Sequence, residues 1–340
     1  MPTSPPESAT ITELDLEIAG ALEVNPRADW TLLGRALGVS ASTVGRRWAY
    51  LQEHGLAWVT VAPGERFLSN ASAAFINLSV KPSRYQATIE HLCSVPEFAT
   101  VSMVSGAYDV QLDCFAHSNE QLMATINTAF ENLKGISSRN VIFLTVLYRH
   151  GSQWSSGSLA PDQAQLIRQR GMEASGPGLG SSLQDRLLSE LARNGRASWS
   201  DLAAACAVSA QTARRRVERY LATGYFSLRC DTSPALQAGR REISLGLNVP
   251  APHVEVAGHY FSSLSSCRVS AQVLGSENLT VTLRVRDYAE VQYHEKELHA
   301  LAPGSTVVSR QAVIRTYKRM GHLLDANGHR QGFVPLPLWA

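Results

Sequence analysis

Hydrophobic residues in the first part of the chain recur at helical spacing in three successive runs. The first run stops at Asn25-Pro26, and the second covers Trp30–Leu37 and breaks at Gly38. The third run follows Ser40, a favourable N-cap residue, and ends near Gly55. A tight turn between two short amphipathic helices lets them cross closely, so this pattern predicts a helix-turn-helix.

The residues that follow change to strand-like patterns. Leu56–Val61 and Arg66–Leu68 flank a Pro63-Gly64 turn, which predicts a small wing. Strands and helices are then predicted in the order βαββαβ, at residues 74–81, 83–95, 98–106, 109–116, 118–134 and 140–149. This is the order of a ferredoxin-like unit. Because the last strand is apolar on both faces, we expect its sheet to be covered by helices on one side and by another sheet on the other.

The whole pattern occurs twice. A shift of 169 residues aligns Leu14–Gly55 with Leu183–Gly224 without a gap, and a repeat of this length indicates a duplicated domain pair. We therefore predict an α+β fold with winged helix-turn-helix domains at 11–70 and 182–240 and ferredoxin-like domains at 71–150 and 241–320. A disordered lead-in at 1–10, a linker at 151–181 and a C-terminal tail at 321–340 complete the prediction. The tail is expected to cover an exposed edge or a neighbouring subunit.

The composition narrows the class of protein. Lys and Arg number 31 against 29 Asp and Glu, so any affinity for nucleic acid has to come from local basic clusters. The five cysteines are scattered without a CxxC pair, which predicts free thiols in a reducing compartment. Without a membrane-length apolar run or a signal peptide, we expect a cytoplasmic, nucleoid-associated protein. The absence of nucleophile motifs, phosphate loops and metal-ligand spacings predicts no enzyme activity, cofactor or metal site.

One face of the third helix is basic in both copies. Val44, Trp48 and Leu51 line the opposite, buried face. Arginine reads guanine edges or clamps phosphates, Ser, Thr and Gln contact bases or backbone, and a helix N-terminus attracts phosphate. The predicted contacts to double-stranded DNA are Ser40, Ser42, Thr43, Arg46, Arg47, Tyr50, Ser209, Gln211, Thr212, Arg214, Arg215, Arg216 and Arg219.

The order LDxxI…R…LGVSxSTVxRRxxxLxxxG, followed by a wing and βαββαβ with Gly106-Ala107-Tyr108-Asp109, resembles the leucine-responsive/AsnC family of prokaryotic transcription regulators. The resemblance covers nearly the whole chain, twice. It implies a DNA-binding regulator whose βαββαβ domain pairs through its sheet and senses an amino acid or related effector near the Gly-x-x-Asp turn. The implied effector-binding positions are Gly106, Tyr108, Asp109, Gly275 and Asn278.

The second copy departs from the family pattern. Asn278 replaces the acidic residue of the turn, and Ala207 replaces the glycine at Gly38, so this copy is a candidate for a partner that has lost sensing. Fusion lets a dimer form inside one chain, and this intramolecular pseudo-dimer is expected to assemble further into homo-oligomers. The two third helices differ at Ser42/Gln211, Gly45/Arg214 and Tyr50/Arg219, so we expect unlike DNA half-sites rather than a palindrome.

Two other functions compete with DNA-binding regulation. The architecture also resembles that of sirohaem decarboxylases, in which the helix-turn-helix is scaffold and a tetrapyrrole lies near the second domain. That enzyme would require arginines and a histidine facing a large pocket, and it would not need Arg46, Arg47, Arg215 and Arg216 exposed together. The third hypothesis is an interaction protein with degenerate DNA-binding heads. Ala207 favours this hypothesis, whereas the additional arginines of the second copy oppose it.

Overall fold

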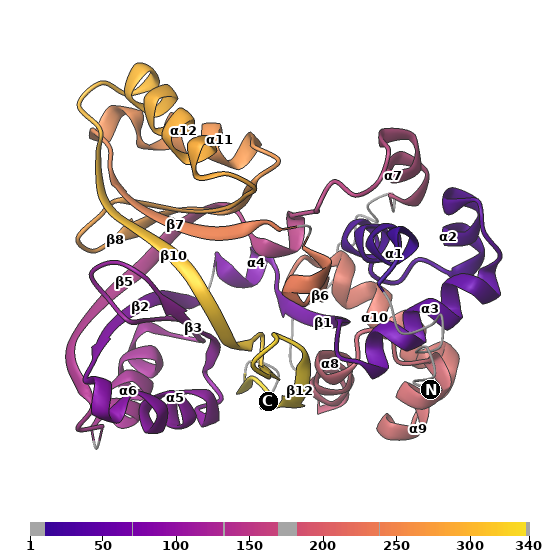
Figure 1. Ribbon diagram of the computed structural model, residues 1–340. Helices are drawn as coiled ribbons and strands as arrows, with labels where there is room; N and C mark the ends of the chain where they lie inside the picture. Colours follow the sequence, from indigo (N-terminus) through magenta and orange to yellow (C-terminus); the bar gives the residue numbers. More distant parts are fainter. Residues whose placement is uncertain (1–10, 70, 132, 169–181, 238, 338–340) are drawn as a thin grey trace, which may run out of the picture.

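The molecule consists of a pair of helical heads on one side and a pair of helix-covered sheets on the other (Figure 1). The computed structural model describes residues 11–69, 71–131, 133–168, 182–237 and 239–337. The predicted lead-in, the second part of the predicted linker and the last three residues of the tail lie outside the described residues. Below, copy 1 denotes residues 11–150 and copy 2 denotes residues 182–320.

Each head contains the three helices that the sequence predicts. Head 1 comprises α1 (Glu13–Val24), α2 (Trp30–Leu37) and α3 (Ala41–Glu53), and head 2 comprises α8 (Ser182–Arg193), α9 (Trp199–Cys206) and α10 (Ala210–Ala222). The turn between α2 and α3 needs a left-handed residue, which is Gly38 with φ 70°. Its counterpart between α9 and α10 is Ala207 with φ 54°, so head 2 keeps the same turn at a steric cost.

The predicted wing is wrong. Strand β1 (Ala57–Pro63) is followed by the short helix α4 (Glu65–Leu68), and β1 pairs instead with β6 of copy 2 (Phe226–Thr232) in an antiparallel two-stranded sheet. Every residue of β1 is buried. A wing hairpin within copy 1 would have left part of this apolar strand exposed to solvent, whereas pairing with copy 2 covers it. In this register Thr60 faces Arg229, its own counterpart in the repeat, so the pseudo-twofold axis passes through this pair.

Both ferredoxin-like units form as predicted. Copy 1 contributes β2 (Ser72–Val80), α5 (Tyr85–Ser94), β3 (Phe98–Val104), β4 (Val110–Ala116), α6 (Asn119–Phe130) and β5 (Ile136–Arg149). Copy 2 contributes β7 (Arg241–Asn248), α11 (Val254–Ser263), β8 (Cys267–Leu274), β9 (Leu279–Val285), α12 (Tyr288–Leu301) and β10 (Thr306–Arg319). Short 3₁₀ helices η2 (Pro82–Arg84), η4 (Pro234–Leu236) and η5 (Ala251–His253) precede or connect these elements.

The two units join edge to edge. The strand order β3-β4-β2-β5-β8-β9-β7-β10 closes on itself because β10 also pairs with β3. Strand β5 therefore bridges the two sheets, and the prediction that both of its faces are covered is only partly right. Ile142 is buried, but Thr145 and Val146 are exposed.

The segments that the repeat does not explain hold the heads against the sheets. After β5, η3 (Gly151–Gln153) and α7 (Pro161–Ile167) pack onto the heads, and Trp154 and Ile167 are buried. The tail forms a hairpin of β11 (His322–Leu324) and β12 (Arg330–Phe333) that continues the sheet from β10. The amide of Arg330 donates to the Gly55 carbonyl over 2.9 Å, so the described part of the tail binds head 1 of its own chain.

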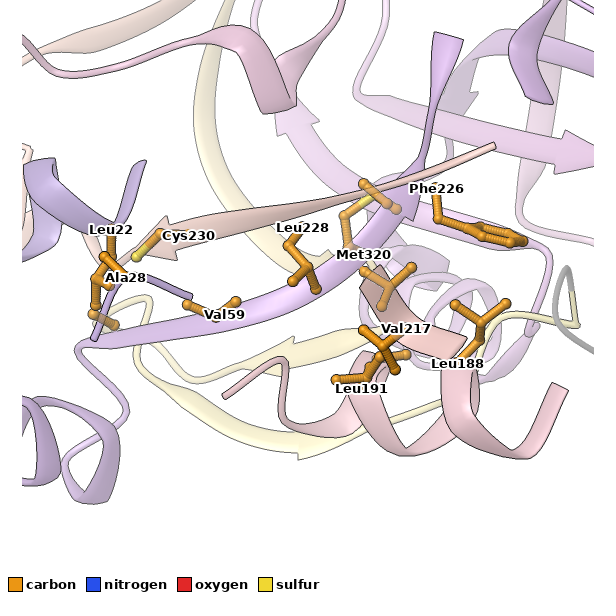
Figure 2. Packing of buried hydrophobic residues seen from close by; sticks show 14 of the residues in the cluster. Leu22, Ala28, Val59, Leu188, Leu191, Val217, Phe226, Leu228, Cys230 and Met320 are labelled. Atoms are coloured by element: carbon orange, nitrogen blue, oxygen red, sulfur yellow. The ribbon is translucent and has the colours of Figure 1, made fainter. Parts of the chain in front are cut away.

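The hydrophobic core of the heads is shared between the two copies. Leu22 and Val59 of copy 1 and Leu188, Leu191 and Val217 of copy 2 belong to one cluster (Figure 2). Separate clusters lie between each sheet and its own helices. The heads therefore form one packed body rather than two independently attached domains.

Candidate nucleic-acid interface

The third helix of each head begins with a cluster of hydroxyl groups. The Ser40 Oγ accepts from the Thr43 amide over 3.0 Å, which confirms Ser40 as the N-cap of α3. The Ser209 Oγ does the same for Thr212 over 3.1 Å at the start of α10. Ser42 and Gln211 lie exposed beside these caps. Hydroxyl groups and backbone amides therefore gather where a helix terminus favours a phosphate.

Exposed arginines continue along both helices. Arg46 of α3 and Arg215 and Arg219 of α10 are exposed, as predicted. Arg214 is also exposed, and its Nε donates to Glu218 one turn later over 2.8 Å. A pair this exposed is weak and leaves the guanidinium able to exchange partners. Head 2 thus carries the denser positive charge.

Arg47 departs from the predicted exposed set. Its guanidinium forms an ion pair with Asp15 of α1, and only 11% of its side chain is exposed, while the Asp15 side chain is fully buried. It also lies 4.7 Å from the centre of the Tyr50 ring, which is half-buried and stacks on His54. The hydrogen bond to Asp15 raises the pKa of Arg47. Arg47 therefore binds α3 to α1 and holds the helix that carries Arg46.

The counterpart of Arg47 in head 2 is half-buried Arg216. Its Nε is buried and has no hydrogen-bond partner among the described residues. The residue at the Asp15 position is Gln184, which is also buried but carries no charge. Head 2 thus offers no carboxylate at the position from which Asp15 pairs with Arg47 in head 1.

Two arginines that the prediction left out clasp the heads together. Arg27 donates to the carbonyls of Gly195 and Ala197 over 2.7 and 3.0 Å. Its guanidinium carbon lies 3.9 Å from the centre of the Trp199 ring. Burial lowers the pKa of Arg27 to about 10, so its guanidinium is still charged at neutral pH.

Arg196 makes the reciprocal contacts. It donates to the carbonyls of Pro26 and Ala28 over 2.7 and 2.9 Å and lies 3.7 Å from the centre of the Trp30 ring. Burial, followed by the charge of Arg27, lowers the pKa of Arg196 to about 10. Arg27/Arg196 and Trp30/Trp199 coincide in the repeat, so the signal was present in the sequence, but only contact across the two copies explains it.

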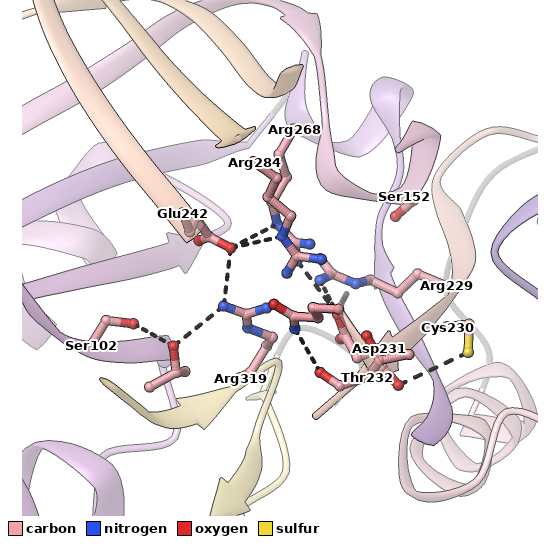
Figure 3. A network of polar contacts seen from close by, with 12 residues as sticks. Ser102, Ser152, Arg229, Cys230, Asp231, Thr232, Glu242, Arg268, Arg284 and Arg319 are labelled. Carbon is pink, nitrogen blue, oxygen red and sulfur yellow. Dashed lines mark hydrogen bonds and ion pairs between the residues drawn. The ribbon is translucent and has the colours of Figure 1, made fainter. Parts of the chain in front are cut away.

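A buried ionic cluster lies between the heads and the sheets (Figure 3). Its members are Arg229, Asp231, Glu242, Arg268, Arg284 and Arg319. The Glu242 carboxylate accepts from Arg284 over 3.0 Å and from Arg319 over 3.3 Å, and the Asp231 carboxylate pairs with Arg229 and Arg268. Burial alone would raise the pKa of Glu242, but the charges of Arg319 and Arg284 outweigh it and lower the pKa. Removing one partner of such a buried pair typically costs about 3–5 kcal/mol.

On the other side of the pseudo-twofold axis, the equivalent positions line an apolar cavity of about 80 Å³, here called the central cavity. The offset of 169 residues takes its wall residues Ala62, Ala73, Phe115 and His150 onto Asp231, Glu242, Arg284 and Arg319 of the ionic cluster. Duplication thus made two equivalent interior sites that have since diverged in chemistry.

The central cavity has a polar rim at Asp113 and His150. Burial raises the pKa of Asp113 to about 6. Burial and the nearby charge of Arg229 lower the pKa of His150 to about 4, and its Nδ1 has no partner among the described residues. Asp113 lies on the face of β4 opposite the buried apolar one, where the sheet meets the heads.

The positions implied for an effector lie at turns that join the two units. The Asp109 Oδ2 accepts from the Val80 amide over 2.7 Å. In copy 2, Asn278 makes the equivalent bond with the Val249 amide over 2.9 Å and also donates to the Val249 carbonyl over 2.7 Å. The change from Asp109 to Asn278 therefore preserves the turn that ties two strands together.

The glycines of these turns make close contact with the other copy. A Cβ on Gly106, where φ is 100°, would lie 3.0 Å from the carbonyl oxygen of Arg310 in β10. A Cβ on Gly275 would lie 3.2 Å from the Ile142 side chain in β5. Tyr108 is half-buried beside Gly106. The five implied positions thus fall into two sets, one at each junction between the units.

Within the ranges that the structure describes, neither a cluster of metal-ligating side chains nor a membrane-spanning helix is found. Within those ranges, His, Cys, Asp and Glu side chains form no group of three or more arranged to hold a metal ion. No helix there combines the length and the hydrophobicity needed to span a bilayer. The cysteines are free, and all but half-buried Cys93 are buried.

Comparison with known proteins agrees with this arrangement. The AsnC-type helix-turn-helix domain matches residues 11–52 and 185–221, and the Lrp/AsnC ligand binding domain matches residues 73–150. An uncharacterised HTH-type transcriptional regulator of Pyrococcus abyssi is 25% identical over 142 residues, which are 42% of this chain and 90% of that protein. The HTH-type transcriptional regulator Ptr1 of Methanocaldococcus jannaschii is 24% identical over 144 residues, which are 42% of this chain and 97% of Ptr1.

Solved structures of one enzyme match along both copies. The sirohaem decarboxylase NirDL, crystallised with an iron-uroporphyrin III analogue, superposes with a TM-score of 0.57 over 91% of this chain and 93% of its own. At 11% identity this likeness concerns the fold alone. The chain thus carries the AsnC-type helix-turn-helix domain in both copies and the Lrp/AsnC ligand binding domain in the first, and its repeat is consistent with a tandem duplication of the two domains of the Lrp/AsnC family.

Proposed function

We propose that the chain is a sequence-specific, DNA-binding transcription regulator with two non-identical reading heads, modulated by a small effector such as an amino acid. The family matches and the regulators named among its relatives support this proposal. The observation that carries it is the exposed basic face of α3 and α10, with Arg46 in head 1 and Arg215 and Arg219 in head 2, next to N-termini rich in hydroxyl groups. We expect the protein to work in the cytoplasm.

The predicted contacts divide into two roles under this proposal. Arg46, Arg214, Arg215 and Arg219 are exposed and would contact DNA, together with the hydroxyl and amide groups at the helix starts. Arg47, bound to Asp15, would act indirectly by holding α3 in place. Because head 2 carries more exposed arginines, it would supply more phosphate affinity, and the two half-sites would differ.

The effector would act through the junctions between the two units. Gly106, Tyr108 and Asp109 lie at one junction and Gly275 and Asn278 at the other, so a ligand bound at a junction could change how the sheets meet. A ligand shifts DNA affinity only if it binds one arrangement better than the other. Exposed apolar side chains near the same junctions, such as Leu274 and Ile314, support further homo-oligomerisation.

The proposal is tested by fluorescence anisotropy with DNA from upstream of the protein's own gene, titrated with salt. Arg46→Ala and Arg215→Ala are expected to weaken binding and to lower the salt slope by about one contact each. Arg139→Ala is the matched control, because Arg139 is an exposed arginine on β5 remote from both heads. Binding that is unaffected by either head variant would contradict the proposal.

An enzyme of the sirohaem-decarboxylase type is the second candidate, favoured by the likeness to NirDL along both copies. The size of the central cavity argues against a tetrapyrrole bound there. Pockets for drug-sized ligands measure about 300–1,000 Å³. The central cavity measures about 80 Å³, so a tetrapyrrole would not fit it without rearrangement of the heads. Absorbance in the Soret region after incubation with an iron tetrapyrrole would support the enzyme, and its absence would support the regulator.

A further inference from the structure

A polar groove separate from the central cavity lies between the segment after β5 and copy 2. Its volume is about 460 Å³. Four arginines and one glutamate line it: Arg149, Arg240, Arg284, Arg286 and Glu290. Serines from both sides, including Ser155 and Ser266, complete its walls. We call it the arginine groove.

The charge of the arginine groove is not balanced from within. Arg240 and Arg286 form no ion pair with a carboxylate among the described residues. Glu290 accepts hydrogen bonds from the backbone amides of Arg286 and Asp287, which caps α12. Burial and the charge of Arg286 lower the pKa of Arg240, and the charges of Glu23 and Glu290 offset only part of this effect. Two cations thus face the same space, an arrangement that an anion would relieve.

The floor of the groove is a buried arginine. Only 3% of the Arg284 side chain is exposed, and its guanidinium lies 4.5 Å from the centre of the buried Trp154 ring. Its Nε donates to Glu242 of the ionic cluster over 3.0 Å. Arg149, by contrast, donates hydrogen bonds to the carbonyls of Ser262 and Leu264, over 2.9 and 2.6 Å. Arg149 therefore holds the wall, and the cations available to a ligand are Arg240, Arg284 and Arg286.

The duplication supplies an internal comparison. At the equivalent positions copy 1 has Ala71 for Arg240, Phe115 for Arg284, His117 for Arg286 and Glu97 for Ser266. Three arginines and one serine thus stand in copy 2 where copy 1 has no arginine and carries an acid. The wall-holding role, however, is shared, because Lys318 is the counterpart of Arg149 and donates to the equivalent carbonyl of Val95 over 2.7 Å. The structural cation occurs in both copies, whereas the unbalanced arginines occur only in copy 2.

We propose that the arginine groove binds a small molecule carrying one or two phosphate groups. Guanidinium groups donate paired hydrogen bonds to phosphate oxygens, and serine hydroxyls add further donors. The volume of about 460 Å³ is sufficient for a nucleotide-sized ligand. This site is distinct from the turns at Gly106 and Gly275, so it goes beyond the effector sensing proposed above.

A ligand in the groove would also reach head 1. The Ser156 amide, in the groove wall, donates to the Glu23 carboxylate at the end of α1 over 2.7 Å. Burial raises the pKa of Glu23, and the charge of Arg284 acts in the opposite direction. On the other side, Arg284 shares Glu242 with Arg319, and the same cluster includes Asp231 of β6. An anion bound by Arg284 would therefore lie next to the contacts that connect both heads to the sheets.

The test uses the full chain without DNA, so it does not depend on the proposed regulatory function. Isothermal titration calorimetry measures the binding of pyrophosphate, AMP and aspartate at constant ionic strength. Pyrophosphate or AMP is expected to bind, aspartate is not, and Arg240→Gln and Arg286→Gln are each expected to weaken binding at least about tenfold. Arg241→Gln is the matched control, because exposed Arg241 stacks on Tyr288 outside the groove.

Several outcomes would overturn the proposal. Absence of binding by both phosphate compounds at millimolar concentration would do so, as would binding that Arg240→Gln and Arg286→Gln leave unchanged. Equal binding of aspartate would show a general anion site instead. If the two variants weaken DNA binding while neither phosphate compound binds, the groove belongs to the DNA-contacting surface. Thermal unfolding of each variant establishes that it is folded.

Discussion

The reciprocal contacts of Arg27 and Arg196 make a quantitative prediction about how the heads are held. Arg27→Ala removes two hydrogen bonds from a charged group to backbone carbonyls and one contact with the face of Trp199. Hydrogen bonds of this kind contribute about 1.5–3 kcal/mol each. The ring contact adds about 0.5–2 kcal/mol. Because the freed carbonyls can gain water, we expect a net loss of about 2–4 kcal/mol in the free energy of unfolding.

The two arginines are expected to be coupled. The charge of Arg27 lowers the pKa of Arg196, and this repulsion alone would make the double variant cost slightly more than the sum of the two single variants. The larger effect is that both residues hold the same interface, so that once one is lost the other has less to stabilise. The double variant should therefore cost less than the sum of the two single variants, by at least about 1 kcal/mol.

Urea denaturation followed by tryptophan fluorescence measures these effects, because Trp30, Trp48, Trp58 and Trp199 all lie in the heads and the strands that join them. Arg35→Ala is the control, since Arg35 is exposed on α2, and a change within about 0.5 kcal/mol is expected. A cost below about 1 kcal/mol for Arg27→Ala, or full additivity in the double variant, would refute the reasoning.

The remaining predictions concern the left-handed turn residue of each head and two buried histidines. Ala207→Gly should stabilise the protein by about 0.5–1 kcal/mol, since alanine is strained at φ 54°. Gly38→Ala should destabilise it, and thermal unfolding measures both effects. Burial lowers the pKa of His322 to about 3 and that of His150 to about 4. The unfolded chain therefore takes up protons near pH 6.5 before the folded chain does, and stability should fall by about 2 kcal/mol per histidine as the pH drops from about 6.5 to 5. Asp113, with its pKa raised to about 6, offsets part of this loss. His322→Gln should flatten the profile measured by urea denaturation at each pH, and an unchanged slope would count against the burial argument.

Local patterns in the sequence were sufficient for the elements but not for contacts between the copies. The helix bounds of α2, the N-cap at Ser40 and the βαββαβ order all follow from periodicity and turn residues. The pairing of β1 with β6 does not follow from such patterns, because an apolar strand predicts that it is buried but does not identify the strand that pairs with it. Arg47 shows the same limit: helical periodicity placed it on the exposed face, and its ion pair with Asp15 joins two helices of the head.

Residues that coincide in the repeat also indicate contacts between the two copies. The coincidence of Arg27 with Arg196 and of Trp30 with Trp199 is explained by a contact that is symmetric about the pseudo-twofold axis. Positions that differ between the copies are equally informative. The ionic cluster, the central cavity and the arginine groove each include residues whose counterparts changed chemistry, and none of them lies in a recognisable motif.

The central claim is that one polypeptide reads DNA with two different heads. Hydroxyl-radical footprinting on the upstream DNA, with the wild-type chain, Arg46→Ala and Arg215→Ala, tests it most directly. We predict two unlike protected half-sites, with Arg46→Ala losing protection in one and Arg215→Ala losing it in the other. A strictly palindromic footprint, or the same half-site lost in both variants, would contradict the account.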